Sequence, residues 1–423
     1  MSNNQWERQV SLQHDACCMN AKEIEKTTMK KSVGRVGSRG ALAMVMCTAF
    51  YAASANADIT LIKKGEGDSI TKNFELSVGG DAEVGFQNAM GPSDHGYPAN
   101  VPKRGWADDS NYHVAATYFL PNDWKVIGFY ELAASWFKAI GLKRHSYQNR
   151  DGNDDTYTRQ LFIGVSNPDF GTLTYGQQNN VYYDLVGKKT DIWVNDMGAQ
   201  GASDGVDGQG NFDGSRRAKD LLKYHRQVGE VTLEGSWALP SRDYYINANN
   251  VQRYTRKGGF GLAASWQITP ELNWGTGYSY MRYNLHPFSG DTSSSNQQMV
   301  GTALSWKPGN WTVAGLAGYY KNFIPDTKVV NPDTYFSHDA HGFEYYVGYD
   351  FHLNNPVVRV LKPYFAGDAL HANNFSYNDQ FIGLAATLPA GFKATLEHQF
   401  SHVSGMDKDD RPDATHLRFE YVF

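Results

Sequence analysis

The sequence predicts an all-β chain that closes into a 16-stranded antiparallel transmembrane β-barrel, and three observations support this fold class. Aromatic residues make up 14% of the 423 residues and there are 42 glycines, a composition that suits strands joined by many turns. Segments that alternate apolar and polar residues recur along the chain, as half-buried strands do. Outside one N-terminal stretch, no apolar run reaches the roughly 20 residues that a membrane-spanning helix needs. The formal net charge of −5 also argues against a basic nucleic-acid binder.

The N-terminal residues predict export of the chain. Residues 1–28 show no periodicity and are interpreted as an upstream extension outside the functional protein. Residues 29–57 contain a basic stretch, an apolar core and a final Ala-Asn-Ala, which is the pattern of a secretory signal peptide. Residues 58–423 are then a single barrel domain. All three cysteines precede position 58, so this domain has no disulfide to stabilise it.

The body of the chain repeats one unit, an alternating strand, a short turn and a second alternating strand. Seven such hairpins have turns near residues 120–123, 166–170, 227–229, 268–270, 307–310, 353–356 and 388–391. Residues 74–86 and 415–423 supply an unpaired first and last strand, which brings the total to 16. The connections between hairpins are longer and polar. Short periplasmic turns and long extracellular loops are typical of an outer-membrane barrel.

Aromatic residues are expected to form two girdles at the membrane surfaces. Five tryptophans lie next to short turns: Trp124, Trp266, Trp274, Trp306 and Trp311. Other aromatic residues, including Tyr319 and the terminal Phe423, lie farther along the strands; the pairs Trp311 and Tyr319, Phe343 and Phe351, and Phe392 and Phe400 are spaced by eight positions. At about 3.3 Å per residue and a tilt near 40°, this spacing spans roughly 20 Å, close to the apolar band of about 25 Å. A soluble β-sandwich also alternates, but it does not account for the girdles.

The longest connection, residues 178–215, is the candidate for narrowing the lumen. A 16-stranded barrel is wide enough to hold water, so a segment that folds inward decides what passes. This connection is rich in aspartate: Asp184, Asp191, Asp196, Asp204, Asp207 and Asp213. Folded into the barrel, it would line a constriction with acids.

The segment Gly171-Thr-Leu-Thr-Tyr-Gly-Gln-Gln-Asn-Asn-Val-Tyr-Tyr-Asp184, followed by Thr190-Asp191, resembles the general bacterial porin family. Arg217 and Arg226, nine residues apart, and the terminal Phe423 also match this family of 16-stranded, trimeric outer-membrane diffusion channels. The family's usual Pro-Glu-Phe-Gly-Gly in the constricting loop is replaced by Val194-Asn-Asp-Met-Gly198. This departure affects the tip of the loop and the pore size.

The resemblance implies a constriction in which loop acids face basic residues on the wall. Alternation places Arg159, Arg217, Lys219, Lys223 and His225 on the inner face, with His113 where the family often has arginine. Asp81 and Glu83 are also expected to point inward, which dilutes the basic cluster, and the overall excess of acids favours cations. The alternative is that these inward charges only solvate the wall.

The leading functional hypothesis is passive diffusion of small hydrophilic solutes and ions through a homotrimer in contact with outer-membrane lipid and lipopolysaccharide. A second hypothesis is a saccharide-selective channel, in which Tyr320, Tyr346 and Phe381 stack on sugar rings; these aromatics could equally pack folded loops. An outer-membrane lipase and an adhesion barrel are weaker alternatives.

Chemical signals for catalysis or metal binding are weak. The Gly67-Asp-Ser-Ile70 segment has no companion blocks for an esterase. Residues 151–155 lack the following glycine of a calcium loop, and the histidines lack zinc spacing. No catalytic residue, metal or cofactor is therefore expected. Pro363, within an expected strand, leaves the register of that strand open.

Overall fold

The computed structural model describes residues 58–68, 71–90, 104–107, 110–134, 156–195, 198–201, 210, 214–241, 244–245, 253–286, 291–324, 338–373, 375–405 and 413–423. The chain divides into two compact units, Met1–Ser54 and Ala55–Phe423, and every described element belongs to the second. The predicted extension (1–28) and signal peptide (29–57) lie outside the described residues and stay predictions.

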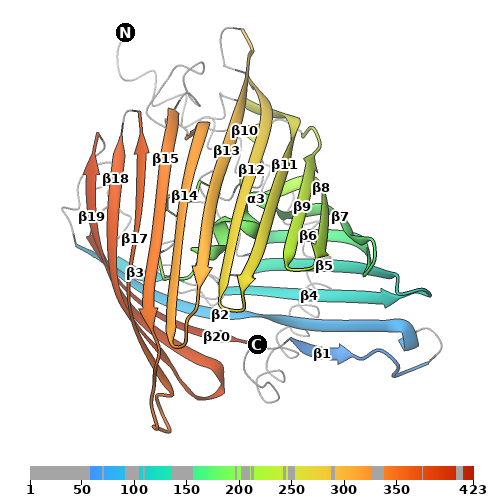
Figure 1. Ribbon diagram of the computed structural model, residues 1–423, viewed down its shortest axis with the longest axis horizontal. Helices are drawn as coiled ribbons and strands as arrows, with labels where there is room; N and C mark the ends of the chain where they lie inside the picture. Colours follow the sequence, from blue (N-terminus) through green and yellow to red (C-terminus); the bar gives the residue numbers. More distant parts are fainter. Residues whose placement is uncertain are drawn as a thin grey trace, which may run out of the picture. The chain divides into compact units, whose positions relative to one another are not determined.

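In the described part of the second unit, 16 antiparallel strands form one closed wall (Figure 1). They are β2 (Phe74–Met90), β4 (Ser110–Phe119), β5 (Lys125–Ala134), β6 (Thr156–Asn167), β7 (Gly171–Asn179), β8 (Arg217–Val228), β9 (Val231–Ala238), β11 (Arg253–Thr269), β12 (Leu272–His286), β13 (Ser293–Trp306), β14 (Trp311–Ile324), β15 (His338–Tyr349), β17 (Val360–Ala372), β18 (Ser376–Thr387), β19 (Phe392–Ser404) and β20 (Asp413–Val422). Each pairs with the next along the chain, and β2 pairs with β20 from Asp81 and Val422 to Met90 and Asp413. This seam closes the barrel, so the predicted fold class is confirmed.

Four short strands pair with strands of the wall but do not add to the 16 strands that surround the lumen. They are β1 (Ile59–Ile62), β3 (Arg104–Ala107), β10 (Tyr244–Tyr245) and β16 (Phe351–His352). The first two pair with β2, the third with β11 and the fourth with β17. The strand β1 pairs with the start of β2, on the edge opposite to β4. Farther along β2 the same edge pairs with β20, so β1 and β20 lie one after the other beside β2.

Seven short connections join the strands at the predicted turns. Asn122 and Asp123 in the first turn have φ of 58° and 60°, and Gly229 in the third has φ of 58°. Such left-handed backbone is typical of tight hairpins and is tolerated by Asn, Asp and Gly. One turn is longer than predicted, because β15 ends at Tyr349 and β17 begins only at Val360.

The two faces of the wall differ as an outer-membrane barrel requires. Leu161, Ile163 and Val165 alternate along β6 with exposed fractions of 54%, 60% and 41%, so this apolar face is the outer one. The register question at Pro363 is resolved, because this residue pairs with Leu384 on β18 without a shift. On its other side, pairing with β15 ends at Tyr364. The proline therefore lies just beyond the end of the pairing with β15, at an interrupted edge where proline is tolerated.

Most described residues of the long connection between β7 and β8 lie inside the wall. It contains the helix α3 (Val181–Leu185) and the 3-10 turn η3 (Gly187–Lys189), and α3 contacts the inner face of β9 and β11–β13 (Figure 1). Two other 3-10 turns, η1 (Thr71–Asn73) and η5 (Pro389–Gly391), lie at strand ends. Within the described residues, none of the helices is long and apolar enough to cross a bilayer.

Candidate pore constriction

One asparagine fixes the point where the connection between β7 and β8, here called the inner loop (residues 180–216), leaves the wall. The side chain of Asn180 accepts a hydrogen bond from the Tyr182 amide at 3.1 Å and caps α3. Its amide nitrogen Nδ2 donates to Ser279 Oγ on β12 at 3.2 Å and to the Gly214 carbonyl. Asn180 therefore joins the two ends of the loop to the wall, and the loop is directed into the lumen.

Two buried carboxylates hold the inner loop against the far wall. Glu344 on β15 accepts hydrogen bonds from the Ala199 amide at 2.9 Å and from Thr190 Oγ1 at 2.5 Å. Glu397 on β19 accepts one from the Val194 amide at 3.1 Å. Both side chains are fully or almost fully buried, and hydrogen bonds to a buried carboxylate are stronger than those between neutral groups. The sequence analysis did not identify these anchors, although both acids alternate inward on their strands.

Aromatic side chains of the same wall pack beneath the loop. Trp193 lies 6.2 Å from Tyr346 and 5.9 Å from Phe381, measured between ring centroids, and the Tyr320 hydroxyl donates to the Ala199 carbonyl at 2.8 Å. All four rings are 3% exposed or less. The loop-packing alternative for Tyr320, Tyr346 and Phe381 is therefore confirmed, and these rings are not available to stack on a solute.

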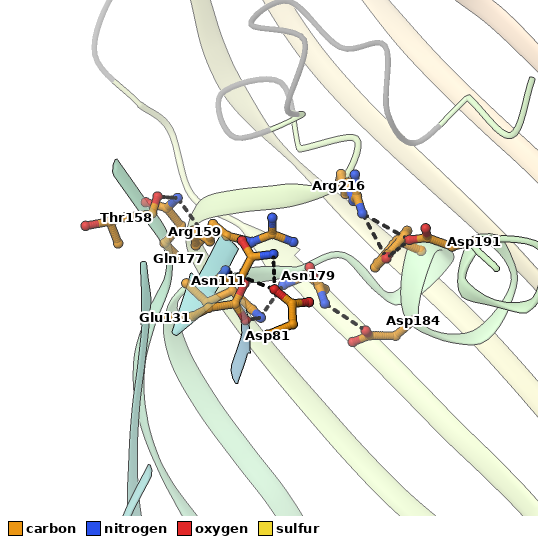
Figure 2. Close-up of polar contacts among 12 residues, drawn as sticks. Asp81, Asn111, Glu131, Thr158, Arg159, Gln177, Asn179, Asp184, Asp191 and Arg216 are labelled. Atoms are coloured by element: carbon orange, nitrogen blue, oxygen red, sulfur yellow. Dashed lines mark hydrogen bonds and ion pairs between the residues drawn. The ribbon is translucent and has the colours of Figure 1, made fainter. Parts of the chain in front are cut away.

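Figure 2 shows Asp81, Asn111, Glu131 and Arg159 of the wall on one side and Asp184, Asp191 and Arg216 on the other. On the wall, Arg159 forms an ion pair with Glu131, which also accepts a hydrogen bond from Gln160 Nε2 at 2.9 Å. Asp81 accepts hydrogen bonds from the amide and the side chain of Asn111 at 3.0 and 3.3 Å.

The described acids of the loop also have cationic partners. Asp191 pairs with Arg216 at 3.0 Å, and the Arg216 guanidinium lies 4.4 Å from the centroid of the Tyr183 ring. Asp184 pairs with Lys223 on β8 at 2.6 Å and accepts a hydrogen bond from Asn179 Nδ2 at 3.2 Å. These acids therefore touch basic groups directly. Opposite charges in contact offset each other's field, which is weaker at a distance than that of separated charges.

Bulges change what simple alternation predicted. Arg159 is the extra residue on β6 opposite the Glu131–Leu132 step. On β8, one extra residue lies between Ala218 and Leu221, where Asp220 has φ of 51°. The regular alternation of faces is therefore interrupted between Arg217 and Lys223. It no longer supports the prediction that Lys219 faces the lumen.

The structure brings only some of the predicted pore residues together. Arg159, Lys223 and Asp191 lie in the ion pairs described above, and Arg217 is 2% exposed at the base of the loop. His113 lies 3.1 Å from Asp58, and His225 lies 2.9 Å from Glu234. Lys219 is exposed. Asp196, Asp204, Asp207 and Asp213 lie outside the described residues.

Most of the predicted girdle residues are exposed, as expected for the lipid-facing side of the wall. Trp266, Trp274, Trp306 and Trp311 are between 41% and 48% exposed, and Phe343, Phe351, Phe392 and Phe400 between 46% and 49%. Trp124 stacks on Phe170 at 5.8 Å, and the Tyr319 hydroxyl donates to Asp339 at 2.9 Å. Phe423 differs from the other members, because it is only 5% exposed.

Burial shifts the pKa of groups on the inner loop. Desolvation lowers the pKa of Lys189 to about 8, because burial penalises the charged ammonium. Its Nζ donates to Ser265 Oγ at 3.3 Å and to Asn273, both on the wall. Desolvation also raises the pKa of Tyr182 and Tyr183. Within the described residues, no cluster of His, Cys, Asp and Glu has the geometry to hold a metal ion.

A family model of Gram-negative porins matches residues 41–354, and the chain belongs to this family. With the closed barrel and the loop inside it, this membership identifies an integral outer-membrane channel for passive diffusion. Family and fold point to a channel without enzymatic activity.

Solved structures share the barrel. OmpF of Salmonella typhi, in complex with daunomycin, is 13% identical, with a TM-score of 0.58 over 83% of this chain and 98% of that chain. The outer membrane channel DcaP of Acinetobacter baumannii is 10% identical, with a TM-score of 0.58 over 85% of this chain and 100% of that chain. At these identities the likeness establishes the fold alone. Comparison with curated proteins gave no significant match.

Proposed function

We propose that this channel conducts small hydrophilic solutes and ions with little charge selectivity, through the space between the inner loop and the wall of β2 and β4–β8. The observation that carries the proposal is the pairing of charges at this level. Arg159 pairs with Glu131, Lys223 with Asp184 and Arg216 with Asp191. Because each cation offsets a neighbouring anion, ions of either sign meet a modest barrier.

Arg159, Arg217, Lys223 and Asp191 are the residues to which we assign the constriction. Arg159 extends from β6 and Lys223 from β8, with β7 between the two strands, and Asp191 belongs to the inner loop. His113, Asp196, Asp204 and Asp207 are retained as predicted pore residues, whereas Lys219 is not, because the bulge on β8 removes the argument that placed it inward. Residues 29–57 are proposed to act as the signal peptide that directs export of the chain.

A homotrimer is the proposed assembly, surrounded by outer-membrane lipid and lipopolysaccharide. The support is an analogy: a structurally similar outer membrane protein, OmpT of Vibrio cholerae, has been solved in a trimer form, with a TM-score of 0.52 and 12% identity. The exposed aromatic band of the wall is consistent with direct contact with lipid.

Planar-bilayer recording tests the proposed function. We expect a large, steady conductance that closes in three equal steps, because each protomer of a trimer carries its own pore. A swelling assay with neutral solutes of increasing size gives the effective pore radius. Closure in single steps would contradict the trimer while leaving the channel intact, and a reconstituted, folded protein without conductance would contradict the channel itself.

A further inference from the structure

Three rings stack side by side on the inner wall, away from the inner loop's aromatic packing. His113 on β4 lies 5.2 Å from Phe129 on β5, with an angle of 27° between the ring planes. Phe129 lies 5.2 Å from Phe162 on β6, at 22°. We call these three residues the ring stack. It crosses three adjacent strands and, at about 4.8 Å per strand, extends roughly 10 Å around the wall.

The ring stack faces the lumen. Phe129 alternates with Tyr130, and Phe162 lies between Leu161 and Ile163; these three neighbours are 38%, 54% and 60% exposed and belong to the lipid face. The rings of the stack are themselves partly exposed, unlike Tyr320 and Phe381 beneath the loop. Apolar rings that face water in a polar channel are unfavourable by about 25 cal/mol per Å². A solute that covers them would recover this free energy.

A polar row borders the stack on the next position of the same strands. His113 pairs across the sheet with Glu131, and Glu131 with Gln160. Glu131 binds both Arg159 and Gln160, as described above. The His113 ring lies 3.1 Å from Asp58. The wall therefore presents an apolar surface directly beside a line of hydrogen-bonding groups.

Charge decides which solute fits this arrangement. The carboxylate of Glu131 is offset by Arg159, and Gln160 is neutral, so this part of the row offers donors and acceptors with little net charge. An ion would gain little there. A neutral ring with one apolar face and polar groups around its edge matches both parts of the site.

We propose that the ring stack and its polar row form a weak binding site for sugar rings inside the channel. The C–H face of a pyranose packs against the parts of the Phe129 and Phe162 rings that the stacking leaves exposed, and its hydroxyl groups exchange hydrogen bonds with Glu131, Arg159 and Gln160. The length of the stack accommodates a disaccharide better than a single ring. This inference rests on the proposed diffusion function and adds a solute class to it.

Maltose block of single-channel currents tests the site. We expect maltose to reduce the ion current in a saturable way. The substitutions Phe129→Ala and Phe162→Ala each remove one ring, and each should raise the maltose concentration for half block by about five- to tenfold, the worth of one aromatic contact. Phe162→Leu keeps an apolar side chain and the fold but removes the ring, and it should weaken the block as well. Tyr130→Ala, on the lipid face of β5 next to Phe129, is the matched control and should leave the block unchanged.

The outcomes separate this inference from the channel function. Normal currents that maltose does not affect would overturn the sugar site and leave the channel standing. The same holds if the Phe162→Leu channel retains wild-type block. Block by tryptamine but not by maltose would assign the rings to aromatic cations and overturn the proposal. Loss of current in the unmodified protein would instead contradict the channel.

Discussion

Single residues in the lumen act through their partners rather than alone. Arg159 pairs with Glu131 on the wall, so we expect it to affect ion selectivity by offsetting the negative charge of Glu131. Replacing it leaves the acid in place. The same logic applies to Lys223 beside Asp184. We therefore expect a basic residue in this channel to limit cation preference without creating a strong preference for anions.

Arg159→Ala should increase cation selectivity, because Glu131 then faces the pore without its partner. One unscreened charge a few ångströms from the ion path in a water-like dielectric is worth about 1 kcal/mol at most, so we expect a two- to fivefold rise in the potassium-to-chloride permeability ratio. Reversal potentials in a salt gradient measure it. Lys307→Ala removes the same charge from a turn outside the lumen and is the control. Reversal potentials that do not move would exclude Arg159 from the constriction.

Lys189 predicts how the loop responds to pH. Its folded-state pKa is lowered to about 8, whereas an unfolded lysine titrates near 10.4. Between these values the unfolded chain binds more protons, so the contribution of Lys189 to the free energy of unfolding increases as pH rises from about 8 to about 10.4. Urea unfolding in lipid vesicles at several pH values measures this contribution as the difference between the wild type and Lys189→Met. A difference that stays constant across this window would contradict the buried, shifted ammonium.

At the scale of elements, the predictions that succeed depend on local signals. The turn at 307–310 separates Trp306 and Trp311 as predicted, because Pro and Gly with alternating flanks define a hairpin within a few residues. The closing pair of β2 and β20 followed from an even strand count. By contrast, the anchors Glu344 and Glu397 bind loop residues 145 and 203 positions away, and no local pattern indicates such contacts.

Bulges limit what alternation predicts about the pore lining. Arg159 and Asp220 lie at irregular positions of β6 and β8, and one inserted residue exchanges the faces of all those beyond it. Composition predicted acids and bases at the constriction, but it did not predict that Asp184 pairs with Lys223 and Asp191 with Arg216. Whether Asp184 faces Lys223 across water or touches it depends on the path of the loop, which is fixed by its tertiary anchors.

At the scale of the whole molecule, stability depends on the seam, because an open barrel exposes unpaired strand edges to lipid. Residues 81–90 of β2 form one side of the seam and 413–422 of β20 the other. Beyond the last ladder pair, Gly80 and Phe423 exchange two backbone hydrogen bonds of 2.9 and 3.0 Å. Gly80 has φ of 151°, and a side chain there would collide with the backbone of Asn111 and Tyr112. Phe423 therefore extends the backbone pairing of the seam by one residue, opposite a position where only glycine fits.

Phe423→Ala should weaken this closure. The Phe423 ring is 5% exposed and lies 6.1 Å from the Tyr112 ring and 5.9 Å from the Tyr421 ring, so its removal leaves a cavity that costs about 3–5 kcal/mol of unfolding free energy. Phe419→Ala, on the same strand but 45% exposed, gives up contacts with lipid instead of packed contacts and should cost only about 1–2 kcal/mol. Urea unfolding in vesicles gives both values, and the heat-modifiable mobility of the folded barrel on gels reports closure independently. Equal losses for the two variants would mean that the terminal ring is not part of the seam, and that backbone pairing alone holds the barrel shut.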